Sequence, residues 1–255
     1  MRSAKSMGRI IGILLLVQLA GLIVPFVLLH PLTTGPAGFL ANAAGASLQI
    51  KVAVFLLFAN CGLTIGIAIA ALPLFRHYSE AMALWLVVLS VIMFLLQAVD
   101  NVHVLSMLSL SQQYAQAGGP DELFQTLAAA VGSARRWAHF TELLVIDCWI
   151  FLLYSILFRF AVVPRALAAF GLLMVMLHFT AIPLRGFLGY SMVTLLGMPM
   201  GLGHLALALW MMVRGFAERL PSKMPSQGLN DIRHRSHHSL AADQARKRRS
   251  VCCPH

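Results

Sequence analysis

The stretch AMALWLVVLSVIMFLLQAVDNVHVLSMLSL, residues 81–110, decides the fold of this chain. An α-helix needs about 20 predominantly apolar residues to cross the hydrocarbon core of a bilayer. This run exceeds that length, and Asp100 is its one charged side chain. The stretch therefore predicts a transmembrane helix that carries a carboxylate inside the membrane.

Five further apolar runs flank this stretch, at residues 10–30, 50–74, 137–158, 164–184 and 190–213. The composition agrees, because 59% of the residues are hydrophobic and 11% are charged, whereas soluble domains have roughly 25% charged residues. We therefore predict an all-α polytopic membrane helix bundle of six transmembrane helices over residues 1–216. The protein is then a multi-pass protein of the cell inner (plasma) membrane, and its main partner is the lipid bilayer.

Lysine and arginine are unevenly distributed between the two predicted sides of the membrane. One side, with the tail, holds 15 of the 19 basic residues, and the other side holds four. The positive-inside rule therefore predicts both chain ends in the cytoplasm (N-in/C-in). This placement accounts for the net charge of +10, so no nucleic acid partner is expected. The basic tail, residues 217–255, is predicted to be disordered and to contact anionic lipid.

Two predicted outer loops, residues 31–48 and 111–135, are longer than the other connections. In the second loop, Pro120-Asp121-Glu122 resembles a helix start, and apolar residues follow it at helical spacing. We expect a short separate helix there, lying on the outer face of the membrane.

Three stretches carry a resemblance to a known family. They are residues 9–16 (RIIGILLL), residues 158–167 (FRFAVVPRAL) and residues 203–216 (GHLALALWMMVRGF). They resemble the DUF4386 family of bacterial membrane proteins, over about residues 8–216. The resemblance implies the membrane architecture and no established activity. The family usually has glutamate at the position of His204.

Ionisable side chains inside a bilayer are costly, so they are candidates for function. At a rise of about 1.5 Å per residue, six of them fall in the outer half of the third, fourth and fifth predicted helices. These six are Asp100, His103, His139, Glu142, Asp147 and His178. We expect the functional site in this region.

The spacing of four of these residues suggests a metal site. Asp100 and His103 are three residues apart, as are His139 and Glu142, so each pair shares one face of its helix. Two imidazoles and two carboxylates at one level can bind zinc or another divalent transition metal ion. A shared mononuclear site requires the two carboxylates to lie within about 8 Å of each other, because ligands sit about 2 Å from the ion.

Other polar residues are candidates for binding a substrate. Asp147 lies about 140° round the helix from Glu142, so the two carboxylates do not easily join one site. Arg185 flanks the predicted outer mouth, as do Arg135 and Arg136, where contact with lipid headgroups is the favoured interpretation. The substrate-binding candidates are Asp147, His178, Arg185, Asn60 and Gln97.

Three functional interpretations therefore stay open. The protein handles a small molecule or ion through the outer polar site, or it is a membrane metalloenzyme in which a metal ion activates water. In the third interpretation, the buried polar groups only fix the packing of the helices. The common phosphate-binding and hydrolase motifs do not occur in the sequence, and no catalytic residue is assigned.

Overall fold

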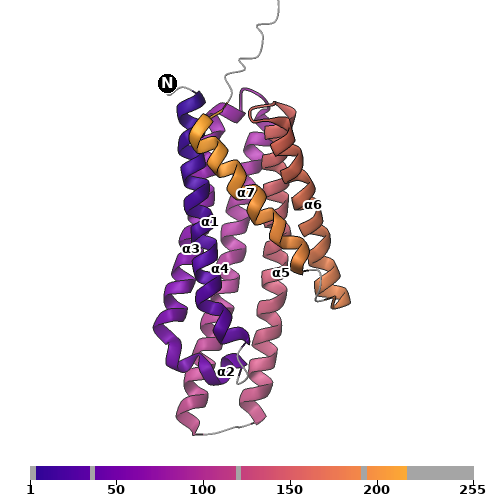
Figure 1. Cartoon of the computed structure of the whole chain (residues 1–255). Coiled ribbons are helices and arrows are strands. Elements are labelled where there is room, and N and C mark those ends of the chain that lie inside the picture. The colour runs from indigo at the N-terminus through magenta and orange to yellow at the C-terminus, as the bar shows by residue number, and fades with distance from the viewer. Residues whose placement is uncertain (1–3, 35–37, 119–121, 191–193, 217–255) are drawn as a thin grey trace, which may run out of the picture. The chain divides into compact units, whose positions relative to one another are not determined.

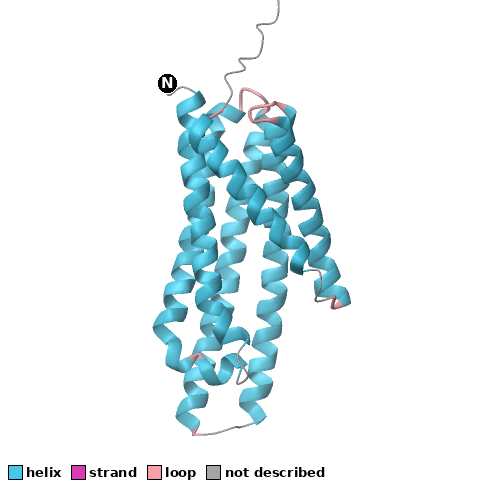
Figure 2. Ribbon diagram, viewed as in Figure 1, coloured by secondary structure: helices cyan, strands magenta, loops and turns pink. Residues whose placement is uncertain are grey.

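The computed structural model describes residues 4–34, 38–118, 122–190 and 194–216. Six helices in these ranges are long and apolar enough to cross a membrane: α1 (Ala4–Thr34), α3 (Ser47–Phe75), α4 (Glu80–Ala117), α5 (Glu122–Arg159), α6 (Arg165–Leu188) and α7 (Thr194–Arg214). Two short elements, α2 (Gly38–Asn42) and the 3-10 helix η1 (Ala44–Ala46), connect α1 to α3. The described residues contain no strand (Figure 2). The prediction of an all-α bundle with six spanning helices is confirmed.

The helices α4 and α5 are longer than the apolar runs that predicted them. Each contains 38 residues, or about 57 Å of helix, whereas the hydrocarbon core is about 30 Å thick. The predicted loop over residues 111–135 with its separate surface helix is therefore wrong. Helix α4 continues to Ala117 and ends at Gly118, whose φ of 80° stops the helix, and α5 runs unbroken from Glu122.

The helices pack mainly against their neighbours in sequence. Contacts join α3 to α4, α4 to α5, α5 to α6 and α6 to α7, and α1 packs against both α3 and α7. The first and last spanning helices therefore lie side by side, as Figure 1 shows. Glycine makes this contact close, because a Cβ atom at Gly12 would lie 2.5 Å from the backbone nitrogen of Met212. Small residues allow membrane helices to approach in this way.

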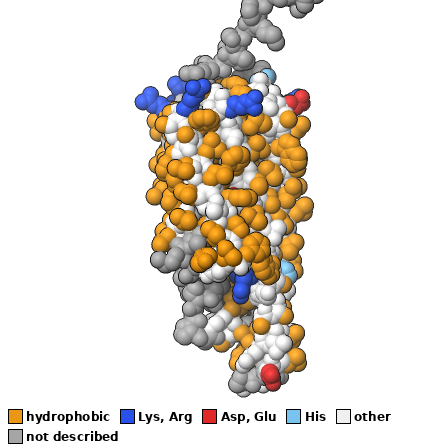
Figure 3. Space-filling view, turned by 90° about the vertical axis from the view of Figure 1, so that its right-hand side faces the viewer, with side chains coloured by type: hydrophobic (Ala, Val, Ile, Leu, Met, Phe, Trp, Pro, Cys, Tyr) orange, Lys and Arg blue, Asp and Glu red, His pale blue; other side chains and the backbone are white. Residues whose placement is uncertain are grey.

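Large side chains from several helices fill the core, including Trp149 and Tyr154 of α5, Phe75 of α3 and Leu207 of α7. Many other large apolar side chains are exposed on the outside of the bundle, where lipid would cover them. Figure 3 shows this apolar surface, with lysine and arginine side chains at one end and again further along the bundle. The tail lies outside the described residues, and with it much of the predicted charge asymmetry. The N-in/C-in orientation therefore stays a prediction.

Candidate functional site

Three of the predicted metal ligands meet between α4 and α5. Asp100, His139 and Glu142 each offer a donor atom, and these three atoms lie within 4.8 Å of one another. The two carboxylate side chains are 2% exposed, whereas the His139 side chain is 48% exposed. We name this group the carboxylate cluster. It is buried on the acidic side and reaches the surface of the bundle through the imidazole.

The helical spacing of α5 builds one wall of this cluster. His139 and Glu142 are three residues apart, and Nδ1 of His139 lies 3.8 Å from Oε2 of Glu142. Arg135 is four residues before His139 and therefore lies on the same face. Its Nε atom lies 3.5 Å from Oδ1 of Asp100. Neither of these two atoms has a hydrogen-bond partner in the part of the chain that the structure describes.

Sequence reasoning missed Arg135 as a member of the site. The residue was assigned to a loop and to headgroup contact, because the apolar run of the fourth predicted helix begins only at residue 137. The signal was present, since positions 135, 139 and 142 repeat at helical spacing. A helix that starts at Glu122 places all three on the face that meets Asp100.

His103 does not join the other three predicted ligands, and it is partly exposed whereas Asp100 is buried. Three residues turn a helix by about 300°, which leaves Asp100 and His103 about 60° apart. This difference in direction explains why one side chain reaches α5 at the cluster and the other does not.

The formal charges of the cluster do not balance. Two buried carboxylates carry two negative charges when ionised, and Arg135 supplies one positive charge. Ionised groups in an apolar interior need a partner. One proton would balance these charges, whereas a divalent metal ion would leave one excess positive charge on the cluster. Donor atoms on a tetrahedral zinc ion are roughly 3.4 Å apart. The three donor atoms lie within 4.8 Å of one another, which is a wider limit than the spacing of donor atoms on a bound zinc ion.

A second buried acid pairs with a histidine between α5 and α6. Nδ1 of His178 lies 2.7 and 2.9 Å from the two carboxylate oxygens of Asp147, and the Asp147 side chain is fully buried. The contact fixes the direction of the imidazole. Its other edge faces α7, where a Cβ atom at Gly197 would lie 2.7 Å from Cδ2 and 3.3 Å from Nε2 of His178.

A small cavity of about 70 Å³ adjoins this pair. His178 and Arg185 are its basic lining residues, and Gly197 leaves the space open on the α7 side. The remaining walls are apolar and come from Phe140, Leu143, Ala181 and Ile182. The cavity therefore offers an imidazole edge and a guanidinium, without a lining acid, to whatever enters it.

The other two substrate candidates, Asn60 and Gln97, do not line this cavity. Asn60 of α3 faces α1, since a Cβ atom at Gly21 would lie 2.7 Å from its side-chain oxygen. Gln97 is buried and donates a hydrogen bond of 3.0 Å to Asn101 on its own helix. The structure thus divides the five candidates, and only Asp147, His178 and Arg185 come together.

The comparison with models of protein families identifies the family of this sequence. The sequence model of the family described as "Domain of unknown function (DUF4386)" matches residues 10–215, which is most of the chain. The chain belongs to the DUF4386 family. The searches of curated proteins and of solved structures find no match to this DUF4386 chain. The match covers the carboxylate cluster and the Asp147–His178 pair, and the family description names no activity for them.

In this DUF4386 chain, His204 lies on α7 next to the ring of Tyr154. The two rings meet edge to face at an angle of 74°, with centroids 6.0 Å apart. The Nδ1 atom of His204 and the hydroxyl of Tyr154 are buried and have no hydrogen-bond partner among the described residues. His204 belongs to neither the carboxylate cluster nor the small cavity.

Proposed function

We propose that this integral membrane protein binds a divalent transition metal ion at Asp100, His139 and Glu142. The observation that carries the proposal is the burial of two carboxylates with one arginine beside them. A divalent cation would supply positive charge to this acidic cluster, and carboxylate and imidazole donors suit such ions. The half-exposed His139 would give the ion a route from the surface of the bundle.

Metal titration of the purified full-length chain tests the proposal. The protein is prepared without a polyhistidine tag, stripped with a chelator and titrated with Zn²⁺ and with Mn²⁺ by calorimetry. His237, His238, Cys252 and Cys253 are replaced in all samples, because the tail carries metal-binding side chains of its own. We expect one ion per chain, and binding that weakens at least about tenfold in Asp100→Asn and in His139→Ala.

The matched control is Glu122→Gln, which removes an exposed carboxylate from the start of the same helix. It should leave the affinity unchanged. Metal-free protein that stays folded and takes up neither ion contradicts the proposal and leaves a proton as the balancing charge. Equal losses in Glu122→Gln and Asp100→Asn would contradict it as well, because binding would then reflect surface charge.

The cavity beside His178 supports a second function, the binding of a small solute through its anionic group. Asp147 directs the imidazole, Arg185 supplies a fixed positive charge, and the lining holds no acid. A volume of about 70 Å³ corresponds to roughly two water molecules at about 30 Å³ each. The cavity therefore suits a group the size of a carboxylate, with the rest of the solute outside.

Thermal unfolding with simple anions tests this second function. Formate and acetate should raise the midpoint of unfolding of the full-length protein, since ligands that bind the folded state stabilise it. Gly197→Ala should remove the effect, because its methyl group would occupy space beside His178. Arg136→Gln is the control, since it removes an exposed arginine outside the cavity lining. An equal anion effect in all three proteins contradicts an anion site here.

A further inference from the structure

A larger cavity lies where α1 begins and α7 ends, at the opposite end of the bundle from the end of α4 and the start of α5 (Figure 1). Its volume is about 500 Å³. Five residues line it, namely Lys5, Arg9, Val213, Arg214 and Phe216. Three of the five are basic and none is acidic. Neither of the two functions proposed above uses this cavity.

Close backbone packing holds the two helices that frame this cavity. A Cβ atom at Gly8 would collide with the backbone nitrogen of Phe216, and one at Gly215 would collide with the carbonyl oxygen of Lys5. Gly215 also has a φ of 71°, which other residues adopt at a cost. The cavity therefore has a fixed frame made of chain segments that are about 200 residues apart in sequence.

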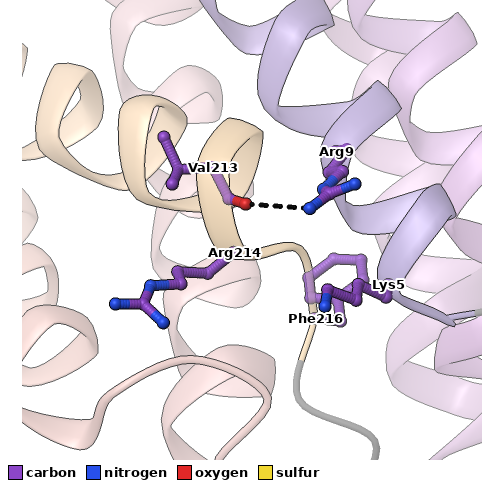
Figure 4. Close-up of a pocket in the computed structure, with 5 residues that line it drawn as sticks. All are labelled: Lys5, Arg9, Val213, Arg214 and Phe216. Carbon is purple, nitrogen blue, oxygen red and sulfur yellow. Dashed lines mark hydrogen bonds between the residues drawn. The ribbon is translucent and has the colours of Figure 1, made fainter.

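The basic side chains approach this frame from both helices. Arg9 donates a hydrogen bond of 3.3 Å to the carbonyl oxygen of Val213, near the end of α7 (Figure 4). Lys5 lies beside the ring of Phe216, whereas the Arg214 side chain extends from the last turn of α7 in a direction away from Lys5 and Arg9 (Figure 4). The hydrogen bond engages one nitrogen of Arg9, while its guanidinium carries five donors.

The charge and the position of the cavity together indicate its ligand. Lys5, Arg9 and Arg214 are exposed, and their positive charges would attract an anion that enters the cavity. Arginine favours phosphate because its planar donor fork matches two phosphate oxygens. Val213 in the lining is 60% exposed, so apolar surface adjoins the basic residues, as at the boundary between acyl chains and headgroups.

We propose that Lys5, Arg9 and Arg214 form a binding site for a phosphate group. The phosphate belongs either to the headgroup of an anionic phospholipid or to a small soluble molecule. The site does not depend on a metal ion at the carboxylate cluster, which lies between other helices.

Lipid binding by the full-length protein tests this proposal. Detergent-solubilised protein is titrated with phosphatidylglycerol, with phosphatidylcholine and, at constant ionic strength, with inorganic phosphate. The test variant is Lys5→Gln/Arg214→Gln, which leaves the Arg9 hydrogen bond in place. The matched control is Arg159→Gln/Arg165→Gln, which removes two cations from the α5–α6 connection at the same end of the bundle. Both proteins keep the basic tail, so its contribution cancels.

We expect the test variant to bind phosphatidylglycerol at least about fivefold more weakly than the control variant does. The same selective loss with inorganic phosphate, together with competition between phosphate and lipid, would identify a soluble phosphate compound as the ligand. Selective loss for the lipid alone would identify the headgroup. Equal weakening in the two variants, or binding of phosphatidylcholine as tight as that of phosphatidylglycerol, would overturn the proposal. If Lys5→Gln/Arg214→Gln fails to fold, Lys5→Gln alone carries the same comparison.

Discussion

The buried polar groups on the two sides of α4 differ in how they are paired. On the side that meets α3, the groups are neutral and satisfy one another. Gln97 donates to Asn101, and Asn101 donates in turn to the carbonyl oxygen of Val54 on α3 at 3.3 Å. On the side that meets α5, the Asp100 carboxyl group lies 3.5 Å from Arg135, and its Oδ1 atom has no hydrogen-bond partner among the described residues.

This difference separates the neutral polar groups, which hold α3 and α4 together by hydrogen bonds, from the carboxyl group of Asp100, which has an atom free to bind a ligand. Neutral amides give a membrane bundle specific contacts at a modest free energy, about 0.6 kcal/mol each on average. Ionised carboxylates in the same surroundings are far more costly, so their retention favours a role beyond packing. Asp100 and Asn101 are adjacent in sequence, and yet they belong to opposite classes.

The largest effect is expected from Glu142→Gln. The substitution keeps the shape of the side chain and removes one charge and one strong ligand from the carboxylate cluster. Zn²⁺ affinity should fall about a hundredfold, while the midpoint of thermal unfolding stays equal or rises, since a buried charge has been removed. Calorimetric titration and thermal unfolding on the same sample check both parts. A drop in stability with unchanged Zn²⁺ affinity would mean that the polar groups between α4 and α5 only hold the helices together, as those between α3 and α4 do.

Arg135→Gln is expected to raise the Zn²⁺ affinity, whereas Glu142→Gln lowers it. Arg135 competes with a bound cation for Asp100, and a unit charge and a divalent ion about 5 Å apart repel by roughly 7 kcal/mol at an effective dielectric constant of about 20. With allowance for its partial exposure, removing it should tighten Zn²⁺ binding about tenfold, which equals 1.4 kcal/mol. Titration of the variant beside Arg136→Gln measures this effect. Weaker binding in Arg135→Gln would show that the arginine positions Asp100 for the ion.

Gln97→Leu should act on stability alone. It leaves Asn101 without its partner on α4, which costs about 1 kcal/mol of folding free energy. The midpoint of thermal unfolding should fall by a few degrees, and Zn²⁺ affinity should stay within twofold of the parent. A clear loss of metal affinity would mean that the two sides of α4 are coupled, and the comparison would fail.

The smallest effect is expected from His103→Ala. This histidine stands outside the group of donor atoms that lie within 4.8 Å of one another. Its removal should change neither Zn²⁺ affinity nor stoichiometry. A loss similar to that of His139→Ala would show that α4 turns on binding to bring His103 to the ion.

The spanning helices were predictable from sequence, because apolar runs of this length have one physical interpretation. The residues at which these helices begin and end were harder to predict. The segment from Ser111 to Ala117 is polar but still helical, since the hydrophobic signal stops at the boundary of the apolar run while the backbone hydrogen bonds continue. The helix start near Glu122 was found, but the pair Arg135-Arg136 was interpreted as the beginning of a second helix.

The composition of the site was predictable in part, for a different reason. Spacing within one helix groups His139 with Glu142 and separates Asp147 from Glu142, which needs only the turn per residue. It does not say how α5 is rotated against α4, and that rotation selects Arg135 and excludes His103. The pairing of Asp147 with His178 depends in the same way on how α5 meets α6.

The length of the α4–α5 hairpin has a practical consequence for imaging. Each helix has 38 residues and is roughly 25 Å longer than the bilayer core is thick, so the end of α4 at Ala117 and the start of α5 at Glu122 would extend beyond the hydrocarbon core. A soluble helical protein inserted between Ala117 and Glu122 would continue both helices as one stiff rod. That rod would give electron microscopy an alignment marker for an otherwise membrane-embedded chain of 255 residues.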